Sequence, residues 1–469
     1  MSQELAFLPV SKLAPLISSR QISPVELTKQ VLQRIEAAEP KVNAYITKLT
    51  QQALDEASAA ERNILAGNYL GPLHGIPIGI KDNINIQGIK TTAGSAVLAK
   101  DIPNYNASTV DRLRQAGVVI VGKLNMHEFA YGATTNNLTY GATHNPWNLE
   151  YIPGGSSGGS GAAVSASECI AALGTDTVGS VNTPAALCGV VGLKPTYGRV
   201  SNFGVIPLSW SMDHVGMVNK SVTDAALTLQ TIAGYDPFDV TTSSLPVPDY
   251  TSNIENGIKG LRIGIPRYYF FDRIDPEVKQ QVEKSIQVLI DLGATPVEVT
   301  LPAELELSFL LSFTIVFSEA SSYHEPLVKK WAELYSPDVR LYLGAGEAIT
   351  ATKYLKAQRL RTSFKQSLNL VMEQVDVLVT PTVPSPAVKI GEDFVVINGQ
   401  EERVSQAMFR YTCPFNLSGQ PTLAVPCGLT EKGLPISMQI AGRAFDEATI
   451  LRVGRAFEAA TNHEFQPAL

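Results

Sequence analysis

Cysteine, aromatic residues and positive charge are all scarce in this 469-residue sequence. Lysine and arginine number 37 against 44 aspartates and glutamates, which leaves a formal net charge of −7. A chain with this balance lacks the basic patch that nucleic-acid binding requires, and its aromatic residues, at 7%, form no cluster with basic ones. We therefore expect no direct nucleic-acid partner.

The few cysteines also exclude several kinds of site. Cys169, Cys188, Cys413 and Cys427 are far apart, and no Cys-x-x-Cys pair or Cys/His spacing suggests zinc. Scattered single thiols are typical of buried cysteines in a reducing compartment. The sequence predicts no metal and no cofactor.

Targeting and membrane signals are absent as well. The N-terminus has no basic stretch followed by a long apolar core, so it does not resemble a secretory signal. No apolar run reaches the length of a membrane span, although an apolar content of 45% supports a sizeable core. We expect a cytoplasmic enzyme without membrane association.

Glycine, in contrast, is abundant, and it is concentrated beside serine in two loops. Residues 151–161 read YIPGGSSGGSG and residues 174–180 read GTDTVGS. One glycine-rich loop is a weak signal. Two such loops, each presenting a serine, suggest that a hydroxyl and several backbone N–H groups converge on one point. Acyl transfer needs that combination of a nucleophile and oxyanion donors.

A base must accompany such a nucleophile, and Lys81 is the best candidate. None of the six histidines lies within the two serine loops. Lys81 follows the apolar, strand-like run 76–80, and a lysine desolvated by apolar walls can act as a base. Taken alone, such a lysine is far more often a surface cation at the end of a strand.

Short apolar runs alternate with helical patterns along the chain. Residues 76–80 and 118–121 are predicted as buried strands around a helix at 108–117, and residues 169–173 as the strand that leads into the second serine loop. The small residues 161–167 predict a tightly packed helix. This alternation favours a mixed α/β sheet with helices on both faces.

The remaining elements continue the pattern. Ser23 and Pro24 begin a helix, with Glu26 completing a capping box, and Pro40 is expected to follow it. The further predictions are strands at 261–266, 375–379 and 422–425, and helices at 276–292 and 447–460. The proline-rich segment 235–260 is predicted to be a surface connection within one domain covering residues 1–469.

Several of these motifs together resemble the amidase signature family of serine hydrolases. They are residues 81–83 (KDN), 123–130 (KLNMHEFA), 154–160 (GGSSGGS), 174–180 (GTDTVGS) and 188–198 (CGVVGLKPTYG). The resemblance keeps its order over nearly the whole chain. It implies a single α/β/α domain around a large twisted mixed sheet.

The resemblance also implies a catalytic triad. Lys81 corresponds to the general base, Ser156 to a relay serine on a cis peptide bond, and Ser180 to the nucleophile. The implied activity is hydrolysis of a carboxamide or urea-like C–N bond through an acyl-enzyme on Ser180.

The oxyanion would be held by backbone N–H groups near Thr177, Val178 and Gly179, together with Ser180. Two positions in this loop depart from the family. Val178 replaces a usual glycine and would be strained if its φ were positive. Asn182 replaces a usual arginine, so a cation that could order the loop or face an acidic substrate is missing.

Other polar residues of the two loops are expected to be structural. Ser157 and Ser160 are expected to hydrogen-bond the loop or begin the following helix, and Asp176 to hydrogen-bond the loop backbone. A Ser-His-Asp triad that uses Asp176 is conceivable, but no histidine fits a hydrolase pattern.

Substrate residues are suggested only weakly. The segment 131–136 matches a family loop that often lines the substrate site, which makes Tyr131 and Gly132 candidates. The basic helical run 350–364 places Arg361 where amidotransferase subunits bind a substrate carboxylate. A solvated helix face and half-buried packing are the ordinary roles of such arginines and tyrosines.

One segment argues against glutamine as substrate. Residues 408–419 match a region that carries an acidic substrate ligand in glutaminases, but here Phe409, Arg410 and Tyr411 occupy it. The overall likeness is closest to stand-alone amidases and carboxybiuret-type hydrolases.

Three functions therefore stay open. The first is a stand-alone amidase acting on a small amide. The second is the glutaminase (A) subunit of a tRNA-dependent amidotransferase, and the third is a non-catalytic scaffold of the same fold. The sequence is compatible with a homo-oligomer and with a small partner subunit.

Overall fold

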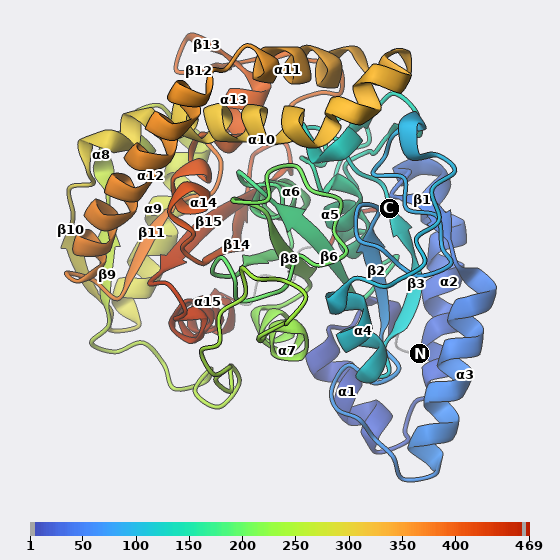
Figure 1. Cartoon of the computed structure of the whole chain (residues 1–469). Helices are drawn as coiled ribbons and strands as arrows, with labels where there is room; N and C mark the ends of the chain where they lie inside the picture. The colour runs from blue at the N-terminus through green and yellow to red at the C-terminus, as the bar shows by residue number, and fades with distance from the viewer. Residues whose placement is uncertain (1–4, 462–465) are drawn as a thin grey trace.

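The centre of the protein is a mixed sheet of eleven strands, as the computed structural model in Figure 1 shows. The structure describes residues 5–461 and 466–469. In spatial order the strands are β1 (Tyr45–Lys48), β3 (Val119–Leu124), β2 (Pro77–Lys81), β6 (Ala171–Asp176), β8 (His214–Asn219), β7 (Val191–Lys194), β14 (Thr422–Leu429), β15 (Pro435–Gly442), β11 (Val377–Pro381), β9 (Arg262–Ile265) and β10 (Thr295–Glu298).

Strand direction divides the sheet. Strands β3, β2 and β6 are parallel neighbours, as are β11, β9 and β10, and the strands between these two groups are antiparallel. The central strands are buried along their whole length. Helices cover both faces, which explains why these strands read as continuous apolar runs.

The helices are α1 (Val10–Ser18), α2 (Pro24–Val42), α3 (Thr50–Leu65), α4 (Ser108–Gln115), α5 (Gly158–Ser165), α6 (Asn182–Cys188), α7 (Val222–Ile232), α8 (Arg267–Phe270), α9 (Pro276–Asp291), α10 (Ser308–Trp331), α11 (Pro337–Glu347), α12 (Ala351–Met372), α13 (Val404–Arg410), α14 (Cys413–Ser418) and α15 (Glu447–Thr461). Two small hairpins, β4 (Asn136–Asn137) with β5 (Gly141–Ala142) and β12 (Phe394–Ile397) with β13 (Gln400–Arg403), lie outside the main sheet. The α/β/α fold class predicted from the sequence is confirmed.

The start of α2 follows its predicted chemistry, but its end does not. Ser23 Oγ accepts hydrogen bonds from the N–H groups of Val25 and Glu26. The sequence predicts Pro40 after the helix, yet it lies inside the last turn. A proline there removes only one late hydrogen bond, and the helix ends at Asn43, which adopts the left-handed conformation.

The predicted surface connection is irregular. No helix or strand occurs between the end of α7 at Ile232 and the start of β9 at Arg262, a stretch that the structure describes in full. Arg199 nevertheless holds this segment by donating to the carbonyls of Leu245 and Pro246.

Helix α10 is unusually apolar. Within the described residues, Ala303–Leu334 is the one helical segment long and apolar enough to span a bilayer, judged by length and composition alone, and the mean hydropathy of its 18-residue apolar window is 1.2. Half of its apolar window is buried inside the protein. It packs against α11, α12 and α14, and Figure 1 shows α10 and α11 together along the top edge of the molecule.

Candidate active site

Sheet register brings Lys81 beside the second serine loop. Lys81 ends β2, which pairs in parallel with β6, so that Ile80 lies opposite Leu173. The carboxyl ends of parallel neighbours meet at one edge of a sheet. Strand β6 ends at Asp176, and the loop with the predicted nucleophile Ser180 begins there. We call residues 177–180 the nucleophile loop after this prediction.

The environment of Lys81 favours a neutral amine. Its side chain is 0% exposed, and burial lowers its pKa from 10.5 to about 7, against the opposing charges of Asp176 and Asp213. Lys81 Nζ lies 2.7 Å from Ser156 Oγ and 2.8 Å from Thr175 Oγ1. A neutral amine at this distance has a lone pair that can accept the Ser156 proton.

Ser156 lies in a segment where glycine is required. The Gly155–Ser156 peptide bond is cis, as the family resemblance implies. A Cβ on Gly155 would approach the backbone of Ala133 and Thr134 to 2.7 Å. The segment 131–134 therefore packs directly on the peptide that carries Ser156.

The neighbouring serines have structural roles, as predicted. Ser157 Oγ donates to the Thr175 carbonyl at 3.0 Å, and Ser160 Oγ donates to the Leu173 carbonyl at 3.0 Å. Both hydroxyls thereby tie α5 to β6. Of the serines in this loop, Ser156 is the one in contact with Lys81.

Ser180 lies close to the loop that carries Ser156, but its hydroxyl forms no hydrogen bond within the described residues. The Ser157 N–H donates to the Ser180 carbonyl at 3.2 Å, which joins the two serine loops. Ser180 is 1% exposed, and its Oγ has no hydrogen-bond partner within residues 5–461 and 466–469. The Lys81–Ser156 contact is therefore formed in this structure, whereas a Ser156–Ser180 hydrogen bond is not.

Asp176 organises the nucleophile loop, as expected. Its Oδ1 accepts from the Gly179 N–H at 2.7 Å and from Asn416 Nδ2 at 2.6 Å. Its Oδ2 accepts from the Val181 N–H at 2.7 Å. One buried carboxylate thus binds the loop to itself and to α14, which lies far along the chain.

The Gly179 N–H, a predicted oxyanion donor, already has an acceptor in this structure. It is committed to Asp176 and is not free for an oxyanion. In the described chain, the N–H groups of Thr177, Val178 and Ser180 donate to no protein acceptor. Val178 is not among the residues with positive φ, so the valine is unstrained and its N–H is available.

Gly179 instead allows the loop a backbone conformation that other residues rarely adopt. Its φ is +134°, and a Cβ there would lie 2.0 Å from Thr412 Oγ1. Thr412 Oγ1 in turn donates to the Val178 carbonyl at 2.6 Å. The carbonyl of Val178 is thereby fixed by a segment more than two hundred residues away in sequence.

Asp213 also supports the loop, although the sequence analysis did not identify it. Its Oδ1 accepts from Thr177 Oγ1 at 2.6 Å, and its Oδ2 from the Leu208 N–H at 2.9 Å. Burial raises the pKa of Asp213 to about 7. In the sequence, its position immediately before the apolar strand β8 is the feature that could have indicated this role.

Arg361 reaches the same region but binds protein groups. Its Nε donates to the Leu417 carbonyl at 2.8 Å and its Nη2 to the Ser211 carbonyl at 2.8 Å. Ser211 Oγ donates to Glu319 on α10, and Ser209 Oγ also donates to Glu319. Arg361 thus links α12, α14 and the loop that carries Asp213.

Tyr131 and Gly132 lie next to the Ser156 segment. Tyr131 is 3% exposed, and its hydroxyl has no hydrogen-bond partner in the described part of the chain. Gly132 has no room for a side chain, because its Cβ would lie 2.3 Å from the His127 ring. Their role as substrate residues stays a prediction.

Asn182 packs into the sheet rather than toward solvent. Its Nδ2 donates to Thr422 Oγ1 at 2.6 Å, and its side chain is buried at the start of α6. The amide thus occupies the place of the expected arginine without supplying a charge.

Among the described residues, no Ser-His-Asp triad is assembled. His214 Nδ1 lies 3.1 Å from the backbone carbonyl of Asp176, not from its carboxylate. Burial holds the pKa of His214 well below its usual value. Ser180 Oγ forms no hydrogen bond to this ring.

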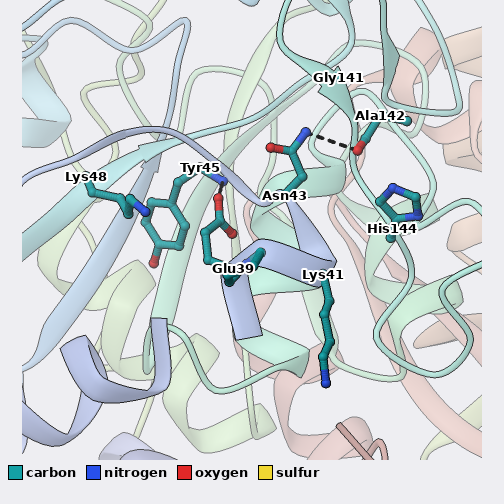
Figure 2. A pocket seen from close by; sticks show the side chains of 9 residues that line it. Glu39, Lys41, Asn43, Tyr45, Lys48, Gly141, Ala142 and His144 are labelled. Atoms are coloured by element: carbon teal, nitrogen blue, oxygen red, sulfur yellow. Dashed lines mark hydrogen bonds between the residues drawn. The ribbon is translucent and has the colours of Figure 1, made fainter. Parts of the chain in front are cut away.

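A surface hollow of about 470 Å³ is lined by other residues, which Figure 2 shows from close by. In it the Asn43 amide donates to the Ala142 carbonyl, and Glu39 accepts from the Tyr45 N–H. Its lining comprises Glu39, Pro40, Lys41, Asn43, Tyr45, Lys48, Gly141, Ala142 and His144. No serine lines it, and the predicted catalytic residues Lys81, Ser156 and Ser180 are not among its lining.

Known proteins resemble the chain over its whole length. The family model described as Amidase matches residues 26–451. The A subunit of glutamyl-tRNA(Gln) amidotransferase from Moorella thermoacetica is 40% identical, with 99% of each chain covered. The same subunit from Thermotoga maritima has a solved structure with a TM-score of 0.81 and 34% identity, covering 97% of this chain and 95% of that one.

A second solved structure has a higher TM-score. It is described as a vestigial protein complex that reveals the evolutionary origins of an s-triazine catabolic enzyme. The TM-score is 0.93 at 33% identity, covering 97% of this chain and 99% of that one.

Proposed function

Because the chain belongs to the amidase signature family, whose members hydrolyse carbon–nitrogen bonds other than peptide bonds, we propose that it cleaves a carboxamide or urea-like bond through an acyl-enzyme on Ser180. The observation that carries the proposal is the 2.7 Å contact between Lys81 Nζ and Ser156 Oγ. A buried lysine with a pKa of about 7 is matched to proton transfer at neutral pH.

The proposed proton path runs through both serines. Neutral Lys81 accepts the Ser156 proton while Ser156 accepts the Ser180 proton, and Ser180 Oγ bonds to the substrate carbonyl carbon. The free N–H groups of Thr177, Val178 and Ser180 support the oxyanion. The C–N bond breaks as the proton returns through Ser156 to the leaving nitrogen, and water then releases the acid by the same path.

One movement is needed before this path is complete. Ser180 Oγ must rotate toward Ser156, because it has no partner in the described part of the chain. Rotation about one side-chain bond is a small change, and catalytic hydrogen bonds are often unformed in the absence of substrate.

The second candidate function is the glutaminase component of a tRNA-dependent amidotransferase. Relatives that are 40–42% identical over 99% of the chain carry the name of the A subunit of glutamyl-tRNA(Gln) amidotransferase. Against this function, the segment where glutaminases are expected to carry an acid has Phe409, Arg410 and Tyr411. Arg361 also donates to Leu417 and Ser211. The scaffold alternative rests on Val178 and Asn182, and against it stands the Lys81–Ser156 contact, which neither residue disturbs.

Partners and location are part of the same proposal. The relatives' name supports a partner subunit, whereas four free, buried cysteines support a reducing cytoplasm. Analytical ultracentrifugation of the purified chain separates a monomer from a homo-oligomer.

Covalent labelling tests the proposed nucleophile. After fluorophosphonate treatment, intact-protein mass spectrometry should find one adduct on the native chain and none on Ser180→Ala. The variant Ser160→Ala is the matched control, because it removes a nearby buried serine and should still form the adduct. Absence of an adduct on folded native protein would contradict the proposal.

The pH profile tests the proposed base. Because Lys81 must be neutral, kcat should fall as pH drops through about 7, the pKa of Lys81. The Asp213 charge raises that pKa, so Asp213→Asn should move the acid limb to lower pH. A profile that stays flat from about two pH units below this pKa to two above it in the native enzyme would exclude a lysine base.

A further inference from the structure

A row of aromatic rings on α10 lies at the side of the two serine loops. Phe309, Phe313 and Phe317 are spaced four residues apart, so they share one face of the helix. Their ring centroids are 4.4 Å and 5.5 Å apart along the row. All three rings are only half-buried. Apolar surface therefore stays available on this face.

The middle of the row, at Phe313, lies near the nucleophile loop. The ring of Phe409, on α13, lies 6.4 Å from that of Phe313. A Cβ on Gly179 would lie 3.2 Å from Phe409 Cδ1, which puts this ring in contact range of the backbone next to Ser180. Phe409 is thus an apolar wall of the loop that carries the nucleophile.

The Phe317 end of the row lies near the loop that carries Ser156. Tyr131 lies 5.8 Å from Phe317 and 5.3 Å from Tyr342, measured between ring centroids. The residues that follow Tyr131 pack against Gly155, beside Ser156. We call the rings of Phe409, Phe313, Phe317, Tyr342 and Tyr131 the aromatic arc. The arc joins the two serine loops on one side.

The Tyr131 hydroxyl adds a polar group to this apolar surface. It is buried and has no acceptor in the part of the chain that the structure describes. Burial raises its pKa well above the usual value, so the group keeps its proton. A buried donor without a partner is unfavourable, and a ligand oxygen within reach would satisfy it.

Near the aromatic arc, the side chains that could bind a charged substrate are either engaged with protein groups or replaced by uncharged residues. Arg361 is occupied by the Leu417 and Ser211 carbonyls. Asn182, in the position of an expected arginine, donates to Thr422. The segment 408–419, where glutaminases are expected to carry an acid, has Phe409, Arg410 and Tyr411 instead. A charged amino acid such as glutamine therefore gains little from these residues.

We infer that the substrate is an aromatic carboxamide whose ring packs against the aromatic arc while its carbonyl reaches Ser180. This inference rests on the proposed function. Edge-to-face and offset contacts with several rings would bind such a group, and burial of its apolar surface would add to them.

A substrate panel on the native enzyme tests this without any variant. We would measure kcat/KM for phenylacetamide and acetanilide against acetamide and glutamine. At least one aromatic amide should exceed both others by about tenfold or more, the gain expected for one well-packed ring. Equal or faster hydrolysis of glutamine or acetamide would overturn the inference.

The variant Phe409→Ala tests whether the preference for aromatic amides comes from the aromatic arc. It should lower kcat/KM for the preferred aromatic amide by about tenfold more than it lowers kcat/KM for acetamide, because the lost ring contacts matter only for the aromatic substrate. Phe409→Leu keeps apolar bulk and should recover part of the loss. Leu310→Ala is the matched control, since this residue is on the same helix as the phenylalanine row but is 63% exposed and outside the arc. An equal loss on both substrates in Phe409→Ala would contradict an aromatic subsite.

Failure of this inference is distinguishable from failure of the proposed function. A protein that takes the fluorophosphonate adduct on Ser180 but shows no preference for aromatic amides retains the proposed chemistry and refutes the aromatic subsite. A folded protein that takes no adduct refutes the proposed nucleophile instead.

Discussion

Replacing Lys81 by methionine should lower kcat by about a thousandfold, the middle of the range for loss of a general base, without weakening the fold. The activity is lost because, within the described chain, no other group contacts Ser156 Oγ as an acceptor for its proton. Rates of amide hydrolysis and of fluorophosphonate labelling should fall together.

The free energy of unfolding of Lys81→Met should stay the same or rise, although its activity falls. Burial lowers the pKa of Lys81 from 10.5 to about 7, so between these pH values the unfolded chain holds a proton that the folded chain has released. The lysine therefore destabilises the folded state at neutral pH, and this penalty shrinks as pH rises from about 7 to 10.5. Methionine removes the penalty, so thermal unfolding at neutral pH should occur at the native temperature or above.

Lys123 provides the matched control for a buried lysine. Its Nζ lies 3.3 Å from Asp82 Oδ1, and neither side chain is exposed. Lys123→Met should lower the free energy of unfolding by about 3–5 kcal/mol, because it leaves a buried carboxylate unpaired. If Lys81→Met loses as much stability as Lys123→Met, Lys81 is a charged structural residue and not a neutral base.

Gly179→Ala should have the second largest effect. A methyl group there meets Thr412 Oγ1 at 2.0 Å, and φ is +134°, a conformation that alanine rarely adopts. The loop must shift, and a displacement of about 1 Å at a nucleophile can lower kcat about a hundredfold. We expect kcat and labelling of Ser180 to fall by at least that factor, measured on folded protein.

Gly71→Ala separates backbone strain from the clash. Gly71 has a similar φ of +129°, but a Cβ there meets nothing within 4 Å. It should cost about 1–3 kcal/mol of stability, the usual range for such strain, and leave kcat unchanged. Full activity in Gly179→Ala would show that the loop tolerates a side chain and that its geometry is not set by this glycine.

The local features of the protein could be predicted from sequence because they depend on neighbours in the chain. Apolar runs indicated the strands around Lys81, and Ser23 marked the start of α2. The family resemblance then supplied the pairing of Lys81 with Ser156, which the 2.7 Å contact matches. Whether Ser180 is the nucleophile stays a prediction.

The contacts that shape the nucleophile loop could not be predicted in this way. Asn416 and Thr412 bind the loop from more than two hundred residues away, and no local pattern marks them. The role of Arg361 could not be predicted for the same reason. Its charge suggested that it binds a substrate, but its N–H groups donate to Leu417 and Ser211, which are distant in the sequence. The commitment of the Gly179 N–H depends on the rotamer of Asp176, which a sequence does not specify.

The dependence of this loop on α14 also has a consequence for synthesis. A ribosome has already joined Lys81, Ser156 and Ser180 when less than half of the chain exists. The amide of Asn416 that holds Asp176, and the hydroxyl of Thr412 that holds Val178, are added only near the end. A nascent or truncated chain therefore carries the reactive side chains without the groups that fix their geometry. Synthesis of the segment 412–416 therefore supplies the last contacts that shape the loop around Ser180.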